Sequence, residues 1–146
     1  MKRVLTISLL VAFTVTASAQ RGRVTLRVGD DAPQLNVEWL KGEKVEQYRE
    51  DRLYLVEFWA TWCGPCKSAM PHLSKMAAQY SDNLTVIGVN IWERNWQERL
   101  YSSFRGKVEK FVEEMGDKMA YSVAMETNEL YMSDKWMRAA GRSGIP

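Results

Sequence analysis

The chain has 146 residues, of which 46% are hydrophobic, 26% are charged and two are cysteines. This length predicts one domain with a substantial core. The formal net charge is only +2, and the basic residues form no continuous stripe, which argues against a nucleic-acid-binding protein.

The N-terminus has the pattern of a signal peptide. Lys2 and Arg3 form a short basic region, Val4–Val15 is mostly apolar, and Ala17-Ser18-Ala19 fits an A-x-A cleavage site. The apolar stretch is shorter than the about 20 residues that a bilayer span needs. No cysteine follows it, which argues against a lipid anchor. We expect cleavage after Ala19, a domain over residues 20–146 and a periplasmic or extracytoplasmic location; an uncleaved amphipathic helix is the alternative.

The next segment predicts an N-terminal hairpin. Leu35–Leu40 and Lys44–Tyr48 are strand-like runs, and they flank a short turn around Gly42. Leu53–Ala60 follows as a β-rich and almost entirely apolar run, which predicts a buried strand.

A helix is predicted from Pro65 to Tyr80, where apolar residues recur at helical spacing. Leu84–Trp92 reads as a second buried strand, so the order strand, helix, strand favours a right-handed parallel unit. Further along, Phe104–Met115 predicts a helix, Tyr121–Met125 a short strand, and Asn128 the cap of a helix that continues to about Ala140.

The two cysteines, Cys63 and Cys66, stand where the first buried strand meets its helix. At a helix N-terminus, unpaired backbone N–H groups and the helix dipole stabilise a thiolate, which is the nucleophile in disulfide exchange. Cys66 lies one turn further on, close enough to close an intramolecular disulfide. Such a small loop constrains an unfolded chain weakly, so the pair suits redox cycling better than structural cross-linking.

Residues 57–67, with Pro71 five positions after Cys66, resemble the active-site strand and first helix of the thioredoxin superfamily. The flanks, residues 28–33 and 144–146, resemble the extracytoplasmic TlpA/ResA-type branch. The resemblance implies an α/β thioredoxin-like fold, here with an N-terminal hairpin. In this family the chain continues past the proline at position 146 into a β-hairpin and a final helix. We therefore expect a fragment whose fold lacks both, with Leu53–Ala60 at a sheet edge and one sheet face uncovered. The alternatives are that the missing strands come from elsewhere or that the protein folds poorly.

The resemblance also implies catalytic roles. Cys63 is expected to attack a partner disulfide, and Cys66 to resolve the mixed disulfide. Glu57 interrupts the apolar strand where thioredoxins carry a buried acid, and strand alternation places it on the same face as Trp59. Burial would raise its pKa and make it a base for Cys66, whereas the alternative is a solvated glutamate. Gly88 stands where thioredoxins often carry a lysine beside this acid.

Substrate contacts are expected from residues around the cysteines and at the end of the chain. By resemblance these are Trp62, Gly64, Pro65, Ile145 and Pro146, the last in a cis peptide bond. The Gly64-Pro65 dipeptide matches reducing thioredoxins, whose potential is near −270 mV, about 150 mV below that of a strong oxidant. Trp59 is expected in the core, and Lys67 either favours the thiolate or is solvated.

The function expected is that of an exported thiol–disulfide oxidoreductase that reduces protein disulfides. Apocytochrome c is a candidate substrate, a membrane thiol reductase is the expected electron donor, and the redox-active Cys63–Cys66 disulfide needs no further cofactor or metal. His72 alone makes a poor zinc site, because such sites need about four ligands. The alternatives are a copper- or metal-handling thioredoxin-like module, and an inactive truncated relic that retains only binding.

Overall fold

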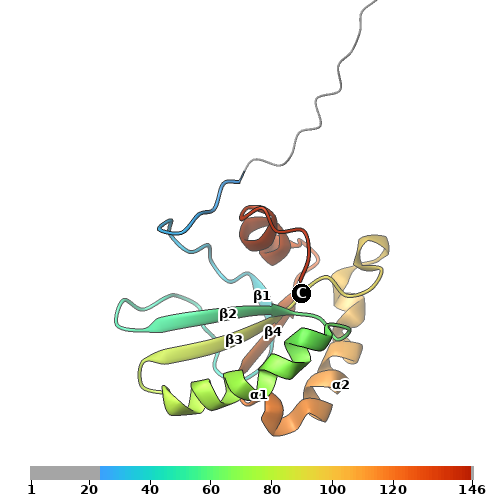
Figure 1. The fold of residues 1–146 in the computed structure, drawn as a ribbon. Helices are drawn as coiled ribbons and strands as arrows, with labels where there is room; N and C mark the ends of the chain where they lie inside the picture. The colour runs from blue at the N-terminus through green and yellow to red at the C-terminus, as the bar shows by residue number, and fades with distance from the viewer. Residues whose placement is uncertain (1–23, 146) are drawn as a thin grey trace, which may run out of the picture.

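A four-stranded mixed sheet forms the centre of the chain, which a computed structural model describes over residues 24–145. The strand order is β1-β4-β3-β2 (Figure 1), with β1 Val37–Lys41, β2 Leu53–Trp59, β3 Leu84–Asn90 and β4 Ser122–Glu126. The expected signal peptide and Pro146, with its expected cis bond, lie outside the described residues. Within these residues, no helix combines the length and the apolar character needed to cross a bilayer.

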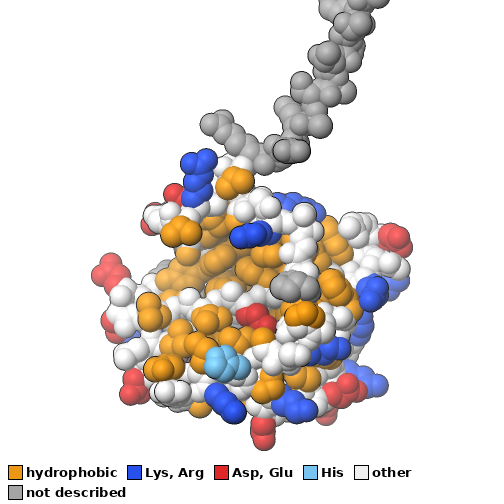
Figure 2. Space-filling model, in the orientation of Figure 1, with side chains coloured by type: hydrophobic (Ala, Val, Ile, Leu, Met, Phe, Trp, Pro, Cys, Tyr) orange, Lys and Arg blue, Asp and Glu red, His pale blue; other side chains and the backbone are white. Residues whose placement is uncertain are grey.

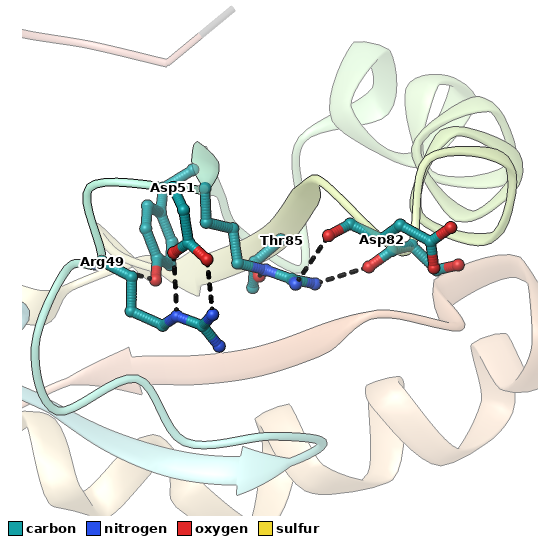
Figure 3. A network of polar contacts seen from close by, with 7 residues as sticks. Arg49, Asp51, Asp82 and Thr85 are labelled. Carbon is teal, nitrogen blue, oxygen red and sulfur yellow. Dashed lines mark hydrogen bonds and ion pairs between the residues drawn. The ribbon is translucent and has the colours of Figure 1, made fainter.

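The predicted parallel unit is confirmed. Strands β2 and β3 pair in parallel from Leu53 opposite Leu84 to Trp59 opposite Asn90, and α1 (Gly64–Gln79) connects them. The carboxyl ends of β2 and β3 therefore meet at one end of the sheet, where the two cysteines lie. At the other end, the Arg52 guanidinium donates to Thr85 Oγ1 and to the backbone carbonyl of Asp82 (Figure 3), which ties the starts of both strands together.

The N-terminal hairpin is a wrong prediction. Only its first half forms a strand, and β1 pairs antiparallel with β4, beginning with Val37 opposite Glu126. Gly42 has a φ of +81°, and a Cβ there would lie 2.7 Å from the Cα of Ser122, so the chain turns tightly against β4. Residues 44–48 form no strand, although within residues 24–145 the outer edge of β1 has no strand beside it, and Val45 packs in the core instead.

One face of the sheet is covered by α1, by α2 (Arg105–Met115) and by the short helix η3 (Gly116–Met119) (Figure 1). The predicted helix ending at Gly116 is confirmed, since Gly116 is its C-cap with a φ of +50°. The side chains of the core on this face include Trp59, Met70, Val108, Met119 and Met125, all fully buried. Both cysteines belong to the same core.

The opposite face is also covered, contrary to expectation. Helix η4 (Ser133–Arg138), a π-helix, and the N-terminal segment pack over Ile87, Val89 and Ile91. The Trp136 ring lies 5.9 Å from the ring of Phe58. This helix starts later than predicted, because Leu130 has a φ of +56°.

Asn128, the predicted cap of that helix, has a different role. Its side-chain oxygen accepts a hydrogen bond of 2.8 Å from the backbone N–H of Ser102, in the short helix η2 (Tyr101–Phe104). Asn128 therefore ties the segment after β4 to the segment after β3, which are far apart in the sequence.

Strand β2 is an edge strand, as expected: among residues 24–145, β3 is the strand paired with it. Leu53 at its start is 71% exposed, and most of the strand is half-buried. Figure 2 shows hydrophobic side chains gathered on the side of the molecule where β2 lies in the foreground of Figure 1.

Candidate active site around Cys63 and Cys66

Cys63 and Cys66 form a disulfide at the start of α1, with their Cα atoms 5.3 Å apart. Cys63 is the N-cap of the helix, and its sulfur accepts a hydrogen bond of 3.2 Å from the backbone N–H of Cys66. This N–H is one of the donors that a helix N-terminus leaves without a backbone partner. After reduction the same donor and the helix dipole would stabilise negative charge on the Cys63 sulfur.

The two sulfurs differ in their surroundings. The Cys66 sulfur lies 3.9 Å from the carbonyl oxygen of Phe58, above the end of β2, although both residues are buried, Cys66 at 6% and Cys63 at 1% exposure. Cys63 is at the first position of the loop-to-helix junction, next to the half-buried Trp62. A carbonyl oxygen does not stabilise a thiolate, so the environment favours Cys63 over Cys66 as the ionised thiol.

Glu57 lies in β2 on the side of the sheet that carries the cysteines. Its neighbours along that face, Leu55 and Trp59, both belong to the core that contains the cysteines. Burial raises the pKa of Glu57 to about 7, and a hydrogen bond of 3.1 Å from the Tyr121 hydroxyl opposes that rise. Burial, and the negative charge of Glu57 beside it, raise the pKa of Tyr121 in turn, so the tyrosine remains a hydrogen-bond donor.

Tyr121 occupies the space beside Gly88, which is paired with Glu57 across β2 and β3. A Cβ on Gly88 would lie 2.9 Å from the Tyr121 ring and 3.1 Å from the Trp59 indole nitrogen. A lysine at position 88 is therefore excluded by packing while Tyr121 is in place. In this chain the neutral phenol of Tyr121, directly before β4, takes the position beside the acid where thioredoxins often have a cation.

Glu93 is the acid that anchors the active-site loop. It is fully buried, and its carboxylate accepts hydrogen bonds of 2.7 Å from both the backbone N–H and the hydroxyl of Thr61, two positions before Cys63. Asn90 and Lys107 also donate to it, the latter at 2.6 Å. Burial alone would raise the pKa of Glu93, but these hydrogen bonds outweigh burial and lower it, so the group is a carboxylate at neutral pH.

Trp62 connects this loop to the segment that follows β3. Its indole N–H donates to the carbonyl oxygen of Trp92 at 2.9 Å, and the Arg94 guanidinium lies 5.7 Å from its ring centroid. An open pocket of about 1110 Å³ lies beside Trp62, between residues 92–97 and residues 138–145.

The other residues predicted to contact substrate lie around the same region. Gly64 and Pro65 are exposed in the first turn of α1, and Ile145 is half-buried and lines the pocket beside Trp62. Trp59 is fully buried, as expected. Lys67 and His72 are exposed on α1. Among residues 24–145, no group of three or more histidine, cysteine or acidic side chains is placed to hold a metal.

Sequence reasoning missed Glu93, Tyr121 and the arginine beside Trp62. Glu93 lies in a stretch that looks polar and poorly periodic, but it comes directly after a long apolar run, a position that could have marked it. Tyr121 gives no local signal, because its partner Glu57 is 64 residues away in the sequence.

Comparison with known proteins places these features in context. The family model for thioredoxin matches residues 38–102. The thioredoxin-like protein YneN of Bacillus subtilis is 35% identical over 82 residues, which cover 56% of this chain and 48% of that protein. The thiol-disulfide oxidoreductase ResA of Oceanobacillus iheyensis is 30% identical over 88 residues, which cover 56% of this chain and 45% of that protein.

A solved structure titled as a thioredoxin-like protein in its oxidised form matches with a TM-score of 0.50 at 24% identity. The match covers 66% of this chain and 61% of that one, and it shows the shared fold. The chain spans about half the length of the curated relatives just described.

Proposed function

Because this chain belongs to the thioredoxin superfamily, we propose that it is an exported thiol–disulfide oxidoreductase that reduces disulfides in other proteins. One observation carries the proposal: Cys63 caps the helix that also contains its disulfide partner, Cys66, and accepts that partner's backbone N–H. This geometry activates one sulfur and keeps the second within reach of it.

The reaction begins from the dithiol. The Cys63 thiolate attacks one sulfur of a substrate disulfide, a mixed disulfide forms, and the other substrate sulfur leaves as a thiolate. Glu57 accepts the proton of Cys66, and the resulting thiolate attacks the Cys63 sulfur. This step expels the second substrate thiolate and forms the Cys63–Cys66 disulfide. Two electrons have then passed from the cysteine pair to the substrate.

Glu57 is suited to the role of base because its pKa is about 7, so near neutral pH it is poised to accept a proton. Glu57 belongs to the strand that ends beneath the cysteines, and its side chain lies on the face of the sheet that carries them. Trp62, Gly64, Pro65, Ile145 and Pro146 are proposed to contact the substrate chain around the reacting disulfide.

The cellular setting is proposed from the sequence. The pattern of residues 1–19 supports export, with cleavage after Ala19, and the similarity to ResA supports an extracytoplasmic branch. A membrane thiol reductase would return the pair to the dithiol, and apocytochrome c is a candidate substrate. The Gly64-Pro65 dipeptide favours a reductant over an oxidant.

The test is reduction of insulin disulfides by the protein with a regenerating thiol, combined with replacement of Cys66 by Ser. The variant should accumulate a covalent mixed disulfide that alkylation mapping assigns to Cys63. Cys63→Ser should form no adduct and is the matched control. Stoichiometric copper retention without disulfide turnover would contradict the proposal and favour a metal-handling module, and adducts at Cys66 alone would reverse the assigned roles.

A further inference from the structure

The pocket beside Trp62 has walls from two distant parts of the chain. Residues 92–97, which follow β3, form one side, and the stretch from Arg138 to Ile145 forms the other. Trp62 closes the end nearest the cysteines, since it directly precedes Cys63. An extended peptide advances about 3.3 Å per residue, so a residue two or three positions from a disulfide held at Cys63 would reach this pocket.

The pocket carries positive charge that the described residues do not neutralise. Arg94, Arg138 and Arg142 line it together with one acid, Glu93. The Glu93 carboxylate is fully buried and already accepts hydrogen bonds from Thr61, Asn90 and Lys107. Arg138 pairs with Asp134, whereas Arg94 and Arg142 have no carboxylate within 4.0 Å anywhere in residues 24–145.

Tryptophan rings hold two of these arginines in place. The Arg94 guanidinium lies 5.7 Å from the Trp62 ring centroid, and that of Arg138 lies 5.3 Å from the Trp96 ring centroid. A guanidinium stacked on an aromatic face keeps its edge N–H donors free, in the fork that matches a carboxylate. The rings also offer flat apolar surface to the aliphatic part of a bound side chain.

The backbone of this loop is held in an uncommon shape. Trp92 and Asn95 have φ values of 50° and 63°, in the left-handed region that side-chain-bearing residues seldom adopt. Such conformations persist where surrounding contacts fix them, and they concentrate at binding sites. Here Glu93, between the two, is fixed by hydrogen bonds from Thr61, Asn90 and Lys107, so the loop presents Arg94 and the tryptophan rings without needing to be ordered by a ligand.

We propose that this pocket is a subsite for acidic side chains of a substrate polypeptide, two or three residues from the cysteine that Cys63 attacks. The inference rests on the proposed oxidoreductase function and names the class of substrate that the site prefers: polypeptides with aspartate or glutamate beside a disulfide. Arg94 and Arg142 bind the carboxylate, and Trp62 links the subsite to the reacting sulfur.

The test compares two peptides that differ only in charge. Each contains one cysteine in a disulfide with a chromogenic thiol, followed by two glutamates in one peptide and two glutamines in the other. With the reduced Cys66→Ser protein, the rate of mixed-disulfide formation is followed at low salt. The acidic peptide should react about tenfold faster, a ratio that 0.5 M salt should largely remove.

Arginine variants in the same background locate the effect. Arg94→Gln and Arg142→Gln should each reduce the acidic-to-neutral rate ratio by about threefold, and the double variant should bring it near one. Arg99→Gln is the matched control, because Arg99 is also exposed and stacked on an aromatic ring, that of Phe104, but lies outside the pocket. Arg99→Gln should leave the acidic-to-neutral rate ratio nearly unchanged.

A binding experiment separates the subsite from the chemistry. A cysteine-free acidic peptide, with serine in place of cysteine, should change the tryptophan fluorescence of the wild-type disulfide form, and Arg94→Gln should weaken its binding. Equal rates for the two peptides, faster reaction of a basic peptide, or a preference that survives the double variant would overturn the subsite. Arg94-dependent self-association without peptide binding would assign the pocket to a second copy and overturn it as well.

The same measurements distinguish failure of the function. Peptide binding that depends on Arg94, without any thiol exchange at Cys63, would retain an acidic-peptide site and contradict the oxidoreductase. Thiol exchange with both peptides at one rate would retain the oxidoreductase and contradict the subsite.

Discussion

The Glu57 carboxylate and the Tyr121 hydroxyl form a polar pair on the core face behind the cysteines. Thioredoxins often place a lysine beside such an acid, and a cation would lower its pKa strongly. A phenol donates one hydrogen bond without adding charge. Burial therefore prevails in this chain, and the pKa of Glu57 remains near 7.

This pair predicts how the resolving step depends on pH. With the Glu57 carboxylate as the proposed base, release of the mixed disulfide should accelerate as pH rises through about 7. Glu57→Gln should remove that dependence and slow release by about 10²-fold, with Cys63 attack retained. The hydrogen bond from Tyr121 lowers the pKa of Glu57, so Tyr121→Phe should raise it and move the midpoint to higher pH. Stopped-flow release rates across pH measure both.

Tyr54→Phe is the matched control for the phenol, because Tyr54 lies in β2 on the other face and bonds to Arg49. Equilibrium unfolding gives an independent check. The folded pKa of Glu57 lies above its ordinary value of 4.5, so its favourable contribution is complete below pH 4.5 and is lost as pH rises through 7. The free energy of unfolding of Glu57→Gln, relative to that of the wild type, should therefore increase by about 2 kcal/mol as pH rises from 5 to 8. A release profile unchanged by Glu57→Gln would remove this residue from the mechanism.

Sequence patterns could locate Cys63 and Glu57 because both signals are local. Helical spacing after Pro65 fixes the helix start at the cysteine, and alternation within β2 fixes the face of Glu57. The acid's partner could not be predicted in this way. Tyr121 comes from a separate segment, and Gly88 shows only that the usual lysine is missing.

At the level of elements, the loop after β3 depends on one buried carboxylate. Glu93 connects Thr61 in the active-site loop with Lys107 in α2, so it links this loop to the helix that covers the sheet. Its neighbours Trp92 and Asn95 hold left-handed conformations that need such support. Trp62 in turn bonds to the Trp92 carbonyl, so Glu93 also positions the tryptophan beside Cys63.

Glu93→Ala should lower the free energy of unfolding by about 3–5 kcal/mol at pH 7, because it leaves buried donors without an acceptor. Denaturant unfolding measures the loss, and altered tryptophan fluorescence of the folded variant would report loosening around Trp62. The pKa of Glu93 is lowered in the fold, so its contribution is complete above pH 4.5 and is lost as pH falls through the folded value. The difference in free energy of unfolding between the wild type and Glu93→Ala should therefore become smaller in acid. Glu98→Ala, on an exposed position of the same segment, is the control; an equal loss in both would contradict the anchoring role.

The elements themselves show where sequence patterns stop being informative. Strands β2 and β3 and helices α1 and α2 were predictable because their periodicity is long and their ends carry clear signals such as Gly116. The hairpin prediction failed because two short runs around a glycine look the same whether or not they pair. The partner of β1 is β4, whose residues lie more than 80 positions later, and only packing decides that choice.

On the scale of the whole molecule, the sheet is sandwiched between α1 and α2 on one face and η4 with the N-terminal segment on the other (Figure 1). An uncovered second face was expected because the fold was expected to lack the family's final helix. That the helix after β4 covers this face could not be read from its periodicity. In the structure its Trp136 packs on Phe58 and donates from its indole nitrogen to the Gln34 carbonyl. This one side chain therefore joins β2, η4 and the N-terminal segment.

Trp136→Ala should reveal whether this cover stabilises the domain. Removing a large packed aromatic ring typically lowers the free energy of unfolding by about 3–5 kcal/mol; because Trp136 is only half-buried, we expect about 3 kcal/mol. The variant should also bind more of a hydrophobic dye such as ANS, since Phe58 and the β3 residues beneath would be exposed. Tyr80→Ala removes an aromatic ring from the exposed end of α1 and should cost far less, because Tyr80 is 50% exposed. If the two variants unfold at the same denaturant concentration, η4 does not close the second face.

The thiol exchange of Cys63 with a small neutral disulfide should persist in Trp136→Ala while the domain stays folded, because the cysteines belong to the core on the opposite face.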